Sequence, residues 1–139
     1  MRETIRLDTQ RREQLIDITE QVRAIAARSG VRDGLLALYC QHTSAALMIQ
    51  ENWDASVPTD VVTLLRKLVP QGAGWLHDQQ DDNADAHLKA GLIGPSETIP
   101  LADGKLALGR WQNVFFCEFD GPRQGRSIIC TVLADVPPG

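Results

Sequence analysis

The chain has 139 residues and a formal net charge of −4, with 14 Lys and Arg against 18 Asp and Glu. That length fits one domain, which we place over residues 1–139. The acidic balance leaves no broad basic surface, so we expect no nucleic-acid partner. No apolar run is long enough to cross a bilayer, and the N-terminus lacks the apolar core of a signal peptide, so we also expect no membrane partner.

The cysteines indicate the compartment. Cys40, Cys117 and Cys130 are odd in number and scattered along the chain, which argues against a disulfide framework and for a reducing environment. We therefore expect a cytoplasmic protein.

In the first half of the chain, strand-like and helix-like patterns alternate. Asp17 and Glu20 have capping-box spacing, with Thr19 as a competing N-cap, and Ser29-Gly30 supplies a helix end. Pro58 suits the first turn of a second helix that ends before Pro70. Strands are predicted at residues 4–7, 14–18 and 35–39, and the run 41–50 continues as a packed segment with His42, Thr43 and Ser44 at a strand end that faces a cleft.

The second half predicts one more helix and then only strands. Asn83 is a good N-cap for a helix that runs to about Ile93, where Gly94-Pro95 stops it. Asp103-Gly104 is a hairpin signal. Strands are expected at 97–101, 105–108, 114–119 and 127–133. The order predicts an α+β fold with antiparallel sheets and two to three helices.

Two polar stretches stand out as a candidate site. The run Trp75–Lys89 holds two of the three histidines, His77 and His87, and the third histidine opens the run His42-Thr43-Ser44. Imidazole and carboxylate groups bind divalent metals and move protons near neutral pH. We predict that the two stretches meet in space.

Four motifs resemble one known family. HTSAALMIQEN, NADAHLKAGLIGPS, SETIPLADGKLALGRWQ and FFCEFDGPR, in this order over nearly the whole chain, are similar to the YjbQ family. That family is also called UPF0047 or the secondary thiamine-phosphate synthase family. Arg110 stands where the family pattern usually has threonine. The resemblance implies a compact α+β subunit with sandwich-like antiparallel sheets, a homotrimer, and a metal or anion site near the subunit contacts.

The histidines have two interpretations. His42, His77 and His87 together match the layout of a catalytic zinc site, in which three ligands leave a fourth position open. The alternative is that each histidine is a satisfied polar residue in its own place. The resemblance favours the metal, with zinc ahead of manganese or magnesium.

The aspartates Asp81, Asp82 and Asp85 also have two interpretations. In the first, they orient a histidine N–H, ligate the metal or act as a general base. In the second, Asp81 and Asp82 favour the N-terminus of the helix near Asn83. Asp85 and His87 are two residues apart and point about 200° apart on an ideal helix, which argues against both binding one metal.

Other polar residues complete the candidate set. Glu51 is either a catalytic acid in the cleft or an exposed carboxylate. Lys89, Arg123 and Arg126 are candidates to bind a phosphate, with Arg123 preferred because it ends the FDGPR motif after a turn. Thr43, Ser44 and Asn83 are candidates to hydrogen-bond the substrate.

The function follows from the resemblance. It implies a metal-assisted enzyme that joins hydroxymethylpyrimidine pyrophosphate to thiazole phosphate and releases pyrophosphate. The proposed catalytic residues are His42, Glu51, Asp85, His87 and Lys89. Two alternatives stay open: a metal-dependent hydrolase of phosphorylated metabolites, or a non-catalytic trimer that binds a metal or metabolite.

Overall fold

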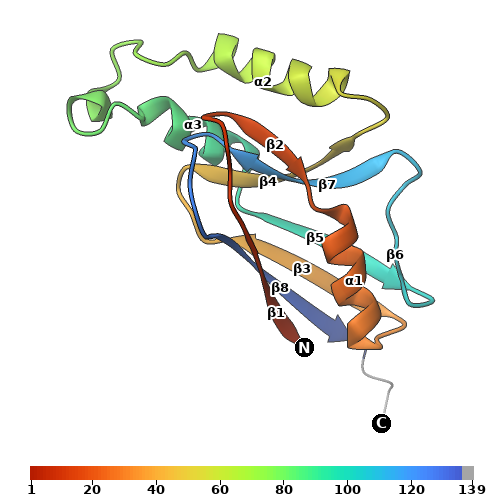
Figure 1. Ribbon diagram of the computed structural model, residues 1–139. Helices are drawn as coiled ribbons and strands as arrows, with labels where there is room; N and C mark the ends of the chain where they lie inside the picture. The colour runs from red at the N-terminus through yellow and green to blue at the C-terminus, as the bar shows by residue number, and fades with distance from the viewer. Residues whose placement is uncertain (136–139) are drawn as a thin grey trace.

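The computed structural model describes residues 1–135. It contains two β-sheets with helices packed against them (Figure 1). The predicted domain extends to residue 139, so its last four residues lie outside the described part. The elements are β1 (Arg2–Leu7), β2 (Gln14–Asp17), α1 (Thr19–Ser29), β3 (Gly34–Cys40), β4 (Ala45–Glu51), α2 (Ser56–Leu68), the 3₁₀ helix η1 (Leu76–Gln79), α3 (Ala84–Ile93), β5 (Ser96–Ala102), β6 (Lys105–Leu106), β7 (Gln112–Glu118) and β8 (Arg126–Ala134).

Both sheets are antiparallel. One has five strands in the order β1-β8-β3-β5-β6, and the other has three in the order β2-β7-β4. In the larger sheet Gly34 pairs with Ala134, and in the smaller sheet Ala45 pairs with Glu118. The predicted α+β class with antiparallel sheets is therefore confirmed. No helix in residues 1–135 is long and apolar enough to span a bilayer.

The main core lies between the two sheets and is covered by α1. Along β3, Leu36, Leu38 and Cys40 are buried, whereas Leu35 and Tyr39 between them are exposed. This alternation follows from the period of two in a strand, which sends successive side chains to opposite faces. One face of the five-stranded sheet therefore carries the core, and the other face carries exposed apolar side chains.

A second core lies on the other face of the three-stranded sheet, beneath α2 and α3 (Figure 1). Phe115 and Cys117 of β7 point into this second core, whereas Phe116 points into the main one. The smaller sheet is thus buried on both faces, which explains the continuous apolar runs in β4 and β7. Ala86 and Ala90 bring α3 close to this sheet because their side chains are small.

The helix starts differ in detail from the capping predictions. α1 begins at Thr19 after Ile18, and Asp17 accepts the Thr19 backbone N–H at 2.9 Å, so the capping box with Glu20 does not form. α3 begins directly after Asn83, as predicted, but Asn83 provides no side-chain cap. The 3₁₀ helix η1 forms where no helix is predicted, and β6 covers only two residues of the strand predicted at 105–108.

Candidate functional site

The centre of the candidate site is the contact between α3 and the segment that joins β3 to β4. His87 Nδ1 lies 2.9 Å from the backbone carbonyl oxygen of Thr43. A carbonyl oxygen only accepts, so in this contact Nδ1 carries the hydrogen and donates it. The lone pair of the neutral ring is then on Nε2. The backbone of the 41–44 segment therefore fixes the tautomer of His87.

A cavity of about 810 Å³ opens beside this contact. It is lined by Tyr39, Cys40, Gln41, His42, Thr43, Ala45, His87, Ala90, Gly91 and Pro95. The two polar stretches singled out in the sequence thus meet, as predicted. The lining has no Lys, Arg, Asp or Glu side chain, so its only ionisable groups near neutral pH are the two imidazoles.

His42 is held as a neutral imidazole. Its Nε2 accepts the backbone N–H of Ser127 at 3.0 Å, which places the ring hydrogen on Nδ1. Burial lowers the pKa of His42 below its ordinary value, and the positive charge of Arg126 lowers that pKa further. The cavity therefore combines one uncharged histidine with one whose Nε2 lone pair is left for a ligand.

His77 lies on the other side of His87. The two ring centroids are 5.1 Å apart with an interplanar angle of 70°, an edge-to-face arrangement. A second hollow of about 480 Å³ adjoins them, lined by Trp75, Leu76, His77, Ala84, His87 and Leu88. His87 thus lies between two hollows.

The predicted zinc site does not form. Within residues 1–135, no group of three or more His, Cys, Asp or Glu side chains has an arrangement that would hold a metal ion. His77 contacts the ring of His87, whereas His42 lines the same cavity as His87. Nε2 of His42 already accepts a hydrogen bond from the backbone N–H of Ser127. The prediction of His42, His77 and His87 as one ligand set is therefore wrong, and no step is assigned to a metal at these residues.

The other face of α3 carries a chain of alternating charges. Arg12 donates to both carboxylate oxygens of Asp85, at 2.9 and 3.0 Å. Lys89 Nζ lies 2.8 Å from Asp85 and 3.1 Å from Glu13, and Arg66 Nε donates to Glu13 at 2.7 Å. Asp85 and Lys89 are four residues apart and so share one helix face. His87, between them, faces the cavity.

This ionic chain corrects two candidate roles. The Lys89 side chain is only 1% exposed and is held by two carboxylates, so it is not free to bind a phosphate in the cavity. Burial alone would raise the pKa of Asp85, but hydrogen bonds from Arg12 and Lys89 outweigh it and hold that pKa below its ordinary value. Asp85 is therefore an ion-pair partner rather than a proton acceptor beside His87.

Glu51 lies away from the histidines. It ends β4, whereas Ala45 at the start of the same strand lines the cavity. Six residues of extended chain separate the two by roughly 20 Å. A role for Glu51 beside His87 within one chain is therefore wrong.

The remaining candidates are engaged with protein groups. The buried Ser44 hydroxyl accepts from Arg126 at 2.9 Å. Asn83 and Arg123 both donate to the same oxygen of Asp120, each at 2.9 Å. Of the predicted substrate-binding residues, only Thr43 lines the cavity.

Sequence reasoning missed the residues that fix the surroundings of the site. Arg12 and Glu13 were not singled out, although they hold Asp85 and Lys89. Glu118 forms a buried ion pair with Arg126, the residue whose charge lowers the pKa of His42. One available signal was a charged pair at four-residue spacing inside an otherwise largely apolar helix, ADAHLKAGLI.

Comparison with known proteins identifies the family. A family model described as "UPF0047 protein YjbQ-like" matches residues 3–135. The chain belongs to the YjbQ (UPF0047) family. A UPF0047 protein of Archaeoglobus fulgidus is 48% identical over 123 residues, which cover 88% of this chain and 94% of that protein. The UPF0047 protein YugU of Bacillus subtilis is 36% identical over 126 residues, which cover 88% and 92%.

Solved structures of the family share the fold. A "YbjQ-like protein of unknown function" from Sulfolobus solfataricus superposes with a TM-score of 0.95 at 35% identity, covering 97% of each chain. A YjbQ/UPF0047 family protein from Clostridium acetobutylicum gives a TM-score of 0.89 at 39% identity, covering 94% of this chain and 99% of that one.

These comparisons correct the predicted function. The names of the relatives give no thiamine-phosphate synthase activity, and the Sulfolobus protein is described as of unknown function. Together with the missing three-histidine ligand set in the described residues, this overturns the prediction of a metal-assisted thiamine-phosphate synthase. The metal-dependent hydrolase and the metal-binding form of the non-catalytic trimer relied on the same ligands and are withdrawn with it.

Proposed function

We propose that this YjbQ family member is an enzyme that transfers protons to and from a small, uncharged carbonyl compound bound in the cavity beside His87. The observation that carries the proposal is the 2.9 Å hydrogen bond from His87 Nδ1 to the Thr43 carbonyl. That bond presents Nε2 as a base. An imidazole whose other nitrogen is held by an acceptor is a common form of general base.

The other groups in the cavity support this chemistry. His42 is neutral, and its Nδ1 carries a hydrogen that can stabilise negative charge developing on a carbonyl oxygen. Apart from the two histidines, the cavity is lined by residues that carry no charge, which suits an uncharged ligand. The free, buried cysteines Cys40, Cys117 and Cys130 support action in the cytoplasm.

The test follows hydrogen–deuterium exchange in D₂O at the carbon beside the carbonyl group of acetone, a proton transfer that free imidazole catalyses as a general base. We expect the protein to exceed an equal concentration of free imidazole, and His87→Gln to lose at least about 100-fold of that rate. His77→Gln is the matched control, because His77 lies beside His87 without the Thr43 contact, and it should retain the rate within about threefold. A wild-type rate no higher than that of free imidazole, or equal losses in both variants, contradicts the proposal.

A second measurement does not depend on turnover. The ¹⁵N shifts of the imidazole rings report which nitrogen carries hydrogen. We expect His87 and His42 both to carry it on Nδ1, because of Thr43 and Ser127 respectively. An Nε2–H tautomer at His87 would remove the proposed base.

We also propose that the chain assembles as a homotrimer, as the family resemblance implies, with subunit contacts beside the site. Leu35 and Leu133 are direct neighbours on the uncovered face of the five-stranded sheet, and both are exposed. Tyr39, on the same face and 50% exposed, lines the cavity. Exposed apolar groups that gather in this way are typical of protein contacts.

A second exposed apolar group adjoins His87. Leu88 and Leu92 are four residues apart on α3, and Leu76 of η1, 84% exposed, lines the second hollow together with Leu88. Sedimentation equilibrium should give about 46 kDa, three times the 15.3 kDa chain. Leu92→Arg should lower that mass. A wild-type mass of 15.3 kDa contradicts the assembly.

A further inference from the structure

The ionic chain on α3 ends in an arginine at both ends. The order Arg12–Asp85–Lys89–Glu13–Arg66 alternates in sign and carries one net positive charge. Its three inner groups are almost fully buried, so water screens them poorly. The excess positive charge is therefore presented where the two arginines reach the surface.

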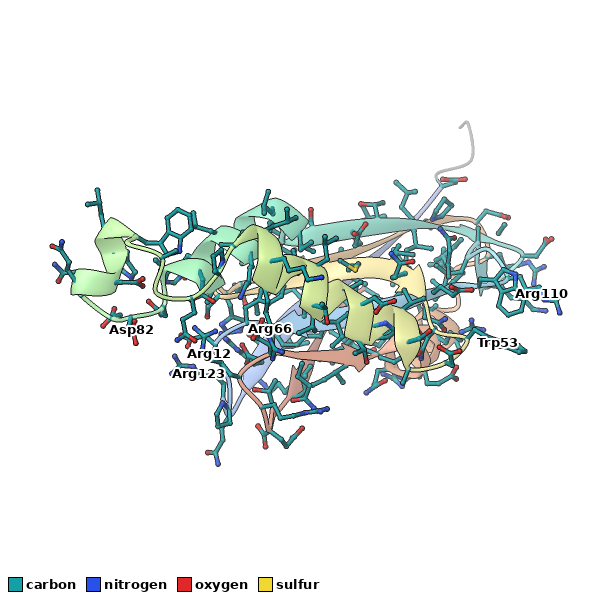
Figure 2. The ribbon with its side chains drawn as sticks, turned by 90° about the horizontal axis from the view of Figure 1, so that it is seen from above. Arg12, Trp53, Arg66, Asp82, Arg110 and Arg123 are labelled. Atoms are coloured by element: carbon teal, nitrogen blue, oxygen red, sulfur yellow. The ribbon has the colours of Figure 1, made fainter. Side chains whose placement is uncertain are left out.

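Both arginines line one groove. This groove, of about 520 Å³, lies between α2 and the segment 11–17, which includes β2. Figure 2 shows Arg12 next to Arg66 of α2, far from Arg110 and Trp53 at the opposite end of the molecule. The other charged residues of the groove besides Glu13 are Arg11 and Asp17, which cancel in formal charge. The groove thus keeps its single positive excess.

Arg66 has donors left over. Its Nε is used by Glu13, and no acceptor within residues 1–135 takes a hydrogen bond from its two terminal nitrogens. The side chain is 61% exposed, so this fork of N–H groups is accessible. A guanidinium fork matches two oxygens of a carboxylate or phosphate. Because Glu13 is itself held by the buried Lys89, Arg66 is held in place before any ligand arrives, which lowers the entropy lost on binding.

We propose that this groove is an anion site, which binds a small metabolite through its phosphate or carboxylate group on the Arg66 fork. Arg12 and the hydroxyl-bearing Thr63 line the same groove and supply further donors. The site lies across α3 from the His87 cavity and shares no lining residue with it. It is therefore a second binding site, independent of the acid–base chemistry proposed for the histidines.

Calorimetric titration of the whole protein with inorganic phosphate, and separately with acetate, tests the site. We expect saturable binding beyond a sodium chloride blank of equal ionic strength, weakened about tenfold or more in Arg66→Gln. Arg28→Gln is the matched control, because Arg28 is a similarly exposed arginine paired with Glu3 elsewhere on the surface. That variant should bind within about twofold of wild type.

The outcomes separate the alternatives. Tighter binding of phosphate assigns a phosphate ester as the ligand class, and tighter binding of acetate assigns a carboxylate. If Arg66→Gln does not fold, Thr63→Val replaces it as the test variant. In addition, the backbone amide NMR signals that move when phosphate is added to the wild type must belong to residues 12–17 and 59–66. His87→Gln should bind phosphate as wild type does, which keeps this test distinct from that of the histidine cavity. No binding beyond the blank, equal losses in the Arg66 and Arg28 variants, or shifts outside the groove would overturn the site.

Discussion

Replacing Lys89 with methionine removes one buried charge and keeps most of the side-chain volume. Lys89 Nζ hydrogen-bonds two carboxylates, at 2.8 and 3.1 Å, in a setting where its side chain is 1% exposed. Breaking a buried ion pair costs about 3–5 kcal/mol. Asp85 keeps Arg12 and Glu13 keeps Arg66 in the variant, so neither acid loses all its partners. We therefore expect the lower end, about 3 kcal/mol.

This loss converts to a melting shift. Unfolding entropy near 2.1 cal/mol/K per residue amounts to about 0.3 kcal/mol/K for 139 residues, so the melting temperature should fall by about 10 °C. Calorimetry at a fixed protomer concentration measures it, since assembly makes the melting temperature depend on concentration. Lys67→Met, at an exposed position in the last turn of α2, is the control and should shift by about 3 °C or less. Equal shifts in the two variants would refute the importance of the ionic chain.

Four further predictions concern an aspartate, a histidine and two glycines. Folding lowers the pKa of Asp85, so the stability that its carboxylate contributes is complete above about pH 3.9 and is lost as the pH falls through the folded-state pKa. Asp85→Asn should reduce this loss of unfolding free energy, measured by urea titration below about pH 4. The pKa of His42 is also lowered, so stability should decline as the pH falls below about 6.5, and His42→Phe should remove that decline. Gly34→Ala should destabilise by about 1–3 kcal/mol, because the new methyl group would overlap the Leu133 carbonyl. Gly91→Ala should stabilise by about 0.5–1 kcal/mol in the same denaturation assay, because a Cβ added at this position in α3 would meet no other atom.

Local patterns predicted the secondary structure well because local forces decide it. The position of α3 followed from Asn83 and from Gly94-Pro95. The polar residues His42 and Thr43 at the end of an apolar strand indicated a cleft, and they do line one cavity with His87. The prediction for Glu51 was wrong because this residue is close to His42 in sequence but lies at the far end of the extended strand β4, away from the cavity.

Long-range partners left no comparable signal. Arg12 and Asp85 are 73 residues apart in the chain, and Lys89 and Glu13 are 76 apart. Nothing in the run of charges from Arg11 to Glu13 distinguishes a buried ion pair from a solvated turn. The tautomer of His42 depends on the backbone N–H of Ser127 in β8, which only the folded sheet brings within reach.

The ionic chain also sets the rotation of α3 about its own axis. Ala86 and Ala90 pack against the sheet with small side chains that interlock little with it. Their burial alone therefore restricts the rotation of α3 only weakly. Asp85 and Lys89 allow only one rotational position, since each must meet a fixed partner. A single residue inserted after Asn83 would turn the rest of the helix by about 100°. His87 would then leave the Thr43 carbonyl, and Asp85 and Lys89 would take the positions against the sheet that Ala86 and Ala90 now occupy. The salt bridges of Asp85 and Lys89 therefore fix the rotation of α3, and through it the orientation of His87.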